Sequence, residues 1–201
     1  MRGYNRRQEH SPPMRDFFGE PGAPSFDDPL GMLRACHGRI ERQLVTLGRL
    51  VRHLPEHGAD ADARAAAAAI LRYFDTAAPN HHADEEASVF PRLLARAPDA
   101  RDLIARLERD HHETFAPLWL KLRPLLAGIA GGQRANLPPA LVRAAEVAYA
   151  EHIAVENDVL LPMCADVLSP EELDAIGAEM AARRGTRWRP PRAPVGTAAP
   201  D

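Results

Sequence analysis

Apolar residues recur every three or four positions over most of this chain, which is the spacing of one face of an α-helix. The first such run covers residues 28–54. Asp28 can cap its first turn, Pro29 suits the first helical position, and Pro55 follows its end. The pattern therefore predicts a long amphipathic helix that presents its apolar face to a core.

Three more runs of the same kind follow, joined by short connections. They cover residues 60–97, 99–127 and 138–164. Pro79 lies inside the first of these and is expected to kink it, because proline lacks a backbone donor and crowds the preceding turn. No stretch alternates polar and apolar residues as a strand does. The four runs predict an all-α, up-down-up-down four-helix bundle.

The two ends of the chain lack the helical period. Residues 1–25 and 185–201 are rich in proline, glycine and arginine, so we expect two disordered tails. Residues 26–184 should form one folded domain. Within it, Ser169 and Pro170 mark the start of a short fifth helix near the C-terminus, packed across one end of the bundle.

The composition excludes several kinds of partner. The formal net charge is −3, from 25 basic and 28 acidic residues, so no strong field attracts nucleic acid or an anionic membrane. The N-terminus has no apolar signal segment, and no apolar run approaches the ~18 residues of a membrane span. We therefore expect a cytoplasmic protein in which Cys36 and Cys164 are reduced thiols.

Two segments of the chain match each other, NHHADEEASVFP in the second run and EHIAVENDVLLP in the fourth. Each contains a histidine followed four residues later by a glutamate, His81 with Glu85 and His152 with Glu156. Residues four apart lie on the same face of a helix. Each run therefore offers one nitrogen and one carboxylate in the same direction.

The first and third runs supply one further histidine each, His37 and His111, each preceded by a leucine four residues earlier. Antiparallel helices of similar length would bring all four histidines to one level of the bundle. Adjacent residues point about 100° apart on a helix, so only one of each neighbouring pair can face inward. The repeat favours His81 over His82 and His111 over His112.

Buried imidazoles and carboxylates are costly when they have no partner, and a metal removes that cost. Nitrogen and oxygen ligands without thiolate suit iron, manganese or zinc. Two carboxylates shared between histidine pairs suit the bridging of two cations. The ligand types do not choose among these metals.

These motifs resemble those of hemerythrin-like, cation-binding HHE domains, and the similarity covers roughly residues 26–184. The resemblance implies a centre of two iron ions (Fe2+/Fe3+) joined by an oxo or hydroxo bridge. It gives Glu85 and Glu156 the bridging role. The terminal nitrogen ligands that it implies are His37, His81, His111 and His152.

One position departs from the pattern of the oxygen-carrying hemerythrins, which place two histidines four apart on the third helix. Here Phe115 follows His111 by four residues. One iron would then have fewer protein nitrogens, a gap for water, His112 or an external ligand to fill. The departure argues against a pure oxygen carrier.

Three functions compete on this basis. The leading hypothesis is a protein that binds or senses oxygen or nitric oxide, or buffers iron. The second is a di-iron redox enzyme that reduces nitric oxide or peroxide or repairs iron clusters; it ranks lower because repair relatives carry cysteines in an added N-terminal domain. A metal-free interaction module would leave six converging polar residues unexplained. Ferritin-like oxidases use Glu-x-x-His rather than His-x-x-x-Glu.

Overall fold

The computed structural model describes residues 25–133, 136–186 and 188. These residues form helices and short connections, and none of them lies in a strand, which confirms the predicted all-α class. None of the described helices combines the length and the apolar character that crossing a membrane requires.

Four continuous helical runs make up most of the structure, and π-helical segments interrupt the last three. The first run is α1 (Pro29–His57), and the second consists of α2 (Ala61–Arg72), η1 (Tyr73–Ala77), α3 (Ala78–Asp84), η2 (Glu85–Val89) and α4 (Phe90–Arg96). The third consists of η3 (Pro98–Ala100), α5 (Arg101–Arg109), η4 (Asp110–Phe115) and α6 (Ala116–Ala130). The fourth consists of α7 (Pro139–Val155), η5 (Glu156–Leu160) and α8 (Leu161–Val167), and the separate helix α9 (Pro170–Arg183) follows it. Of the η segments, η3 is a 3₁₀ turn and the others are π-helical.

Two of the predicted helix starts are confirmed by their caps. Asp28 accepts a hydrogen bond from the backbone N–H of Gly31 at 2.8 Å, and Ser169 forms a capping box with Glu172. The first helix continues three residues beyond its predicted end, through Pro55, to His57. Proline disturbs the turn before it rather than the residues after it, and the helix ends only at Gly58, whose φ is 66°.

Pro79 does not end the second run, which continues to Arg96 as predicted. The π-helical segment η1 ends two residues before this proline. The carbonyl four residues before Pro79 belongs to Asp75, inside that segment. A wider turn there accommodates both the missing donor and the crowded carbonyl.

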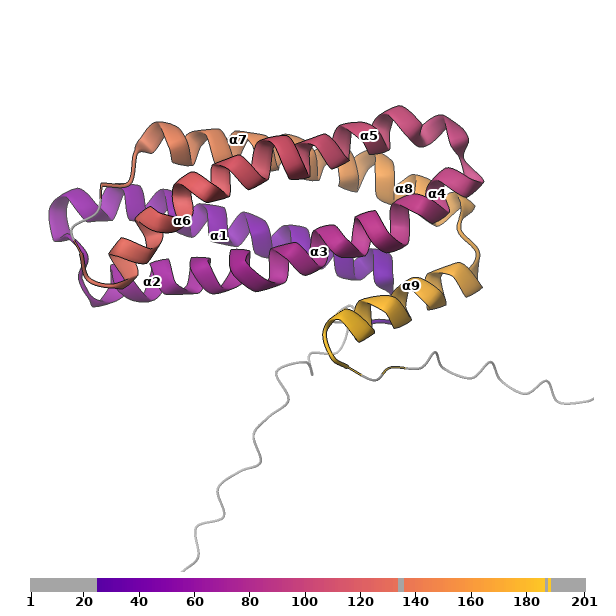
Figure 1. Ribbon diagram of the computed structural model, residues 1–201, viewed down its shortest axis with the longest axis horizontal. Helices are drawn as coiled ribbons and strands as arrows, with labels where there is room; N and C mark the ends of the chain where they lie inside the picture. The colour runs from indigo at the N-terminus through magenta and orange to yellow at the C-terminus, as the bar shows by residue number, and fades with distance from the viewer. Residues whose placement is uncertain (1–24, 134–135, 187, 189–201) are drawn as a thin grey trace, which may run out of the picture.

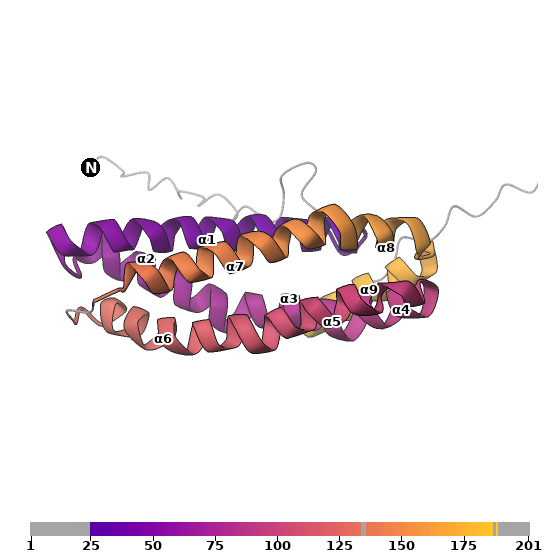
Figure 2. The same cartoon turned by 90° about the horizontal axis from the view of Figure 1, so that it is seen from above.

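The four runs lie alongside one another, and their connections alternate between the two ends of the molecule (Figures 1 and 2). α1 packs against α2 and α7, and α2 packs against α6. α9 lies against α1 and α3, at the side of the runs rather than only across their end.

The core consists of two apolar clusters separated by a polar layer. Representative members of one cluster are Leu47, Ile70 and Leu126, and of the other Leu33, Phe90 and Leu161. Along each run, the buried histidines and glutamates occur where one cluster gives way to the other. The fold therefore places the predicted ligands at one level, enclosed by apolar packing on both sides.

The predicted tails fall mostly outside the described residues, so the domain boundaries stay a prediction. Trp188, within the predicted C-terminal tail, donates a hydrogen bond from Nε1 to Asp27 at 3.0 Å. Its ring also lies against Phe26, with centroids 6.5 Å apart. This contact joins the beginning of the described chain to its end beside α9.

Candidate metal centre

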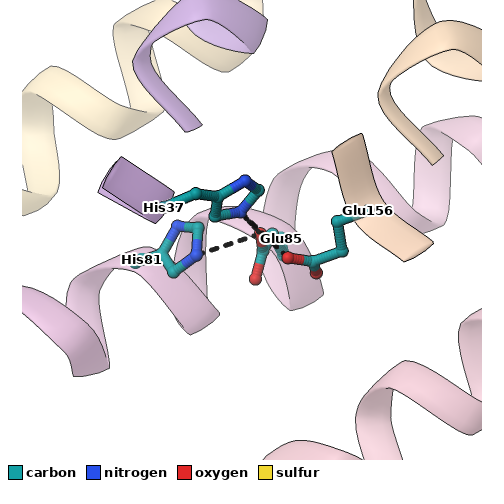
Figure 3. A group of neighbouring side chains, drawn as sticks. All are labelled: His37, His81, Glu85 and Glu156. Atoms are coloured by element: carbon teal, nitrogen blue, oxygen red, sulfur yellow. Dashed lines mark ion pairs between the residues drawn. The ribbon is translucent and has the colours of Figure 1, made fainter. Parts of the chain in front are cut away.

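The structure brings all six predicted ligand residues together in one buried group. Each of the six is at most 3% exposed. Figure 3 shows four of them, from three different runs, pointing toward one another. The whole group is His37 on α1, His81 on α3, Glu85 on η2, His111 on η4, His152 on α7 and Glu156 on η5.

The Glu85 carboxylate faces histidines on both sides. Its Oε1 lies 3.4 Å from Nε2 of His81 and 3.9 Å from Nε2 of His37. Its Oε2 lies 3.6 Å from Nε2 of His111. One carboxylate thus has a different oxygen toward each pair of histidines.

Glu156 repeats this arrangement. Its Oε2 lies 2.9 Å from Nε2 of His37, and its Oε1 lies 3.1 Å from Nε2 of His152. The group therefore divides into a His37/His81 half and a His111/His152 half, with both carboxylates spanning the two. This is the arrangement that two neighbouring cations sharing carboxylate ligands require.

Most of the inward atoms have no hydrogen-bond partner among the described residues. Five of these buried atoms lack a partner, although several lie close to one another: both oxygens of Glu85, both oxygens of Glu156 and Nε2 of His37. Buried polar atoms normally have partners, and leaving several unmatched is costly. Within the two halves, potential ligand atoms lie within 4.8 Å of one another, a spacing that suits bound cations.

Three of the histidines are held from behind by an acceptor on another run. The ring Nδ1 of His37 lies 2.8 Å from Oδ1 of Asn157, and that of His111 lies 2.7 Å from Oε1 of Glu86. Nδ1 of His152 lies 3.2 Å from Oδ2 of Asp110. A ring that donates from Nδ1 to such an acceptor keeps Nε2 free and directed inward.

Both ambiguous histidine pairs have one inward member, the one favoured by the repeat. His81 and His111 are buried, whereas His112 is 67% exposed and has Nε2 3.2 Å from Glu86. Because it is exposed, His112 does not fill the coordination position that Phe115 leaves without a histidine, which was one of the options from the sequence. His82 is half-buried and stacks on His111, with centroids 3.9 Å apart and planes inclined by 11°.

The pKa values of this group are strongly shifted. Burial by itself lowers the pKa of His37, but the adjacent Glu156 and Glu85 carboxylates outweigh it and raise that pKa to about 10. Burial and the charge of Glu156 raise the pKa of Glu85 well above its usual range. Burial lowers the pKa of His81 well below its usual range. Without a cation, the group therefore holds a proton on His37 at neutral pH, and burial beside Glu156 disfavours the ionised form of Glu85.

Asp84, next to Glu85, is buried and bound from α9. It accepts hydrogen bonds from Nη1 of Arg183 and from Nη2 of Arg184, each at 2.6 Å. These paired charges connect α9 to the segment that carries Glu85. The sequence analysis did not identify this contact, because nothing local to either segment indicates it.

Three of the π-helical segments contain predicted ligands. Glu85 and Glu156 are the first residues of η2 and η5, and His111 lies in η4. Each of these segments ends two residues before a proline, and these prolines are Pro91, Pro117 and Pro162. These prolines are the feature of the sequence that could have indicated the π-helical segments. Such segments often occur at functional sites.

Comparison with known proteins agrees with this geometry. The family described as the hemerythrin HHE cation binding domain matches residues 28–164. The chain belongs to this family. A protein of Haemophilus influenzae, which carries no functional name, is 34% identical over 163 residues, covering 80% of this chain and 92% of that relative. The predicted resemblance is confirmed, and with it the binding of a cation.

This HHE domain differs from the oxygen carriers where the sequence indicated. Phe115, four residues after His111, is buried and stacks on Tyr149 with centroids 3.9 Å apart. Its ring also meets that of His152 edge-on at 4.9 Å. An aromatic ring without a ligand atom therefore fills this position, and the His111/His152 half has two histidine nitrogens.

Proposed function

We propose that this HHE protein binds two iron ions in an up-down-up-down four-helix bundle, with manganese or zinc as the alternative metals. Its ligands are the four inward histidines together with Glu85 and Glu156, and an oxo or hydroxo bridge completes the pair. The observation that carries the proposal is that each carboxylate directs different oxygens toward the two histidine halves.

We further propose that the centre binds or senses oxygen or nitric oxide, or buffers iron, in the cytoplasm. When bound, reduced iron supplies the electrons and the open coordination that such diatomic ligands require. The chain holds the ligand nitrogens in place through Asn157, Glu86 and Asp110. The two apolar clusters exclude water from both sides of the polar layer.

A di-iron redox enzyme, reducing nitric oxide or peroxide or repairing iron clusters, is the second candidate. The presence of Phe115 where oxygen carriers have a histidine favours it. A half-centre with two histidine nitrogens has room for an external reactant. Turnover of peroxide or nitric oxide with a supplied reductant would separate this function from reversible binding.

Metal analysis of protein purified without oxygen tests the main proposal. We expect close to two irons per chain after expression in iron-replete medium, and an optical spectrum that changes when oxygen or nitric oxide is admitted. The Glu151→Gln variant, altered at an exposed position of α7, is the matched control and should behave as the parent protein does. One zinc per chain with no iron would contradict the proposal.

A further inference from the structure

A cavity of about 340 Å³ lies beside the His111/His152 half of the centre. It is bounded by segments of the second and third runs and by α7. Its wall is mostly aromatic and includes Phe74, Phe115, Trp119 and Tyr149. Its polar wall comprises His82, Glu86, His111 and His112.

We propose that this cavity binds a small planar phenol, with the ring against the aromatic side chains of the wall and the hydroxyl directed toward His82 and Glu86. The bound phenol would cover the His111/His152 half of the centre. This last step rests on the proposed metal function, whereas the binding itself does not.

The walls favour a flat ring over an aliphatic molecule. The rings of Phe74 and Trp119 have centroids 5.1 Å apart and are inclined by 31°, and Phe115 stacks on Tyr149 beside them. Aromatic rings gain most from neighbouring rings in offset or edge-to-face arrangements. A volume near the lower end of ligand pockets limits the occupant to one or two rings.

The polar groups favour a hydrogen-bond donor on that ring. Glu86 is a carboxylate, which only accepts hydrogen bonds, and Oε1 already faces His111 and His112. Its remaining lone pairs can receive a hydroxyl. His82 has no hydrogen bond to any other described residue, so the ring N–H of its neutral imidazole can donate to the hydroxyl oxygen while the hydroxyl donates to Glu86.

The cavity has a direct connection to the centre through stacked rings. His82 lines the cavity and stacks on His111, which is itself part of the cavity wall. Phe115, also in the wall, meets His152 edge-on. At most one side chain thus separates a ring bound against His82 and Phe115 from each of the two histidines of this half.

Calorimetric titration of the protein as purified, with its metal, tests the binding. The probes are 4-methylphenol and toluene, which differ by the hydroxyl group. We expect 4-methylphenol to bind about tenfold more tightly, the effect of one to two hydrogen bonds. His82→Phe keeps the ring but removes its nitrogens, so it should weaken 4-methylphenol severalfold and leave toluene unchanged.

Leucine substitutions at two alanines distinguish binding in this cavity from general hydrophobic binding. Ala83→Leu fills the cavity and should reduce binding of both probes at least tenfold. Ala59→Leu makes the same change in another cavity, beside Leu54 and Leu137, and should have no effect. If Ala83→Leu fails to fold, Ala116→Leu at an exposed position of the same wall replaces it.

The outcomes decide the two parts separately. Equal affinity for the two probes, or unchanged binding in the cavity-filling variant, overturns the phenol site whichever metal is present. Where iron is bound, 4-methylphenol should shift its optical spectrum in the parent and not in Ala83→Leu. If 4-methylphenol binds tightly and Ala83→Leu weakens that binding, but the spectrum does not shift, the phenol site is supported. The proposal that the phenol covers the metal is then overturned.

Discussion

The two halves of the centre are built from matching motifs but have different surroundings. In the His37/His81 half, Asn157 contacts His37 through a neutral amide oxygen, and Nδ1 of His81 has no partner among the described residues. In the other half, both histidines contact carboxylates, His111 with Glu86 and His152 with Asp110.

This difference shows that a repeat in the sequence does not make the two proposed metal positions equivalent. A carboxylate behind a histidine increases the electron density on the opposite nitrogen and favours a more highly charged metal. The His111/His152 half also borders the cavity, whereas the segment beside the His37/His81 half is bound by α9 through Asp84. We therefore expect the His111/His152 half to be accessible and to prefer a more highly charged metal ion, and the His37/His81 half to be enclosed.

The largest effect is expected from Glu156→Gln, since this carboxylate faces both halves. The substitution keeps the shape and removes the charge, so metal content should fall from about two ions to below one per chain. Elemental analysis measures it, with Glu151→Gln as the control. Retention of both ions would show that the shared carboxylate does not hold them.

The His81→Ala variant should affect one half alone. Removing this nitrogen should release about one ion per chain and lower the melting temperature, because a bound metal stabilises the folded state. His82→Ala is the matched neighbour and should retain both ions. If His82→Ala empties the centre while His81→Ala does not, the inward register on this helix is wrong.

Metal affinity should rise with pH. The pKa of His37 is raised to about 10, so His37 holds a proton in the metal-free protein at neutral pH, and the raised pKa of Glu85 acts in the same direction. A cation that binds Nε2 of His37 must displace this proton, and each displaced proton changes the affinity by up to about tenfold per pH unit. Competition with a chelator between pH 6 and pH 8 measures the slope, and a flat profile would contradict the protonation assigned here.

The smallest effect is expected from the residues behind the histidines, and it tests the comparison directly. Asp110→Asn should weaken binding in the His111/His152 half about tenfold, because the amide carries no charge. Asn157→Asp makes the reverse change beside His37 and should strengthen the other half by a similar factor. Stepwise titration of the metal-free protein would show both shifts. Equal responses of the two halves to either variant would remove the proposed asymmetry.

Much of the centre could be predicted because helix geometry is local. The spacing of four residues between His81 and Glu85, and between His152 and Glu156, is enough to place each pair on one face. The apolar period of the same runs indicates that these faces are buried. All six predicted residues are therefore found together, and the exposure of His112 agrees with the choice of His111.

Other features depended on how the helices are rotated and stacked against one another. The contacts of Asn157 with His37, of Asp110 with His152 and of Asp84 with α9 join residues about 40 to 120 positions apart. A single helix determines which way a side chain points, but not which side chain of another helix it meets. The sequence by itself thus determined the six candidate ligands and the helix faces that carry them. Only packing between helices decided their supporting partners and the cavity, because both exist only where separate surfaces come together.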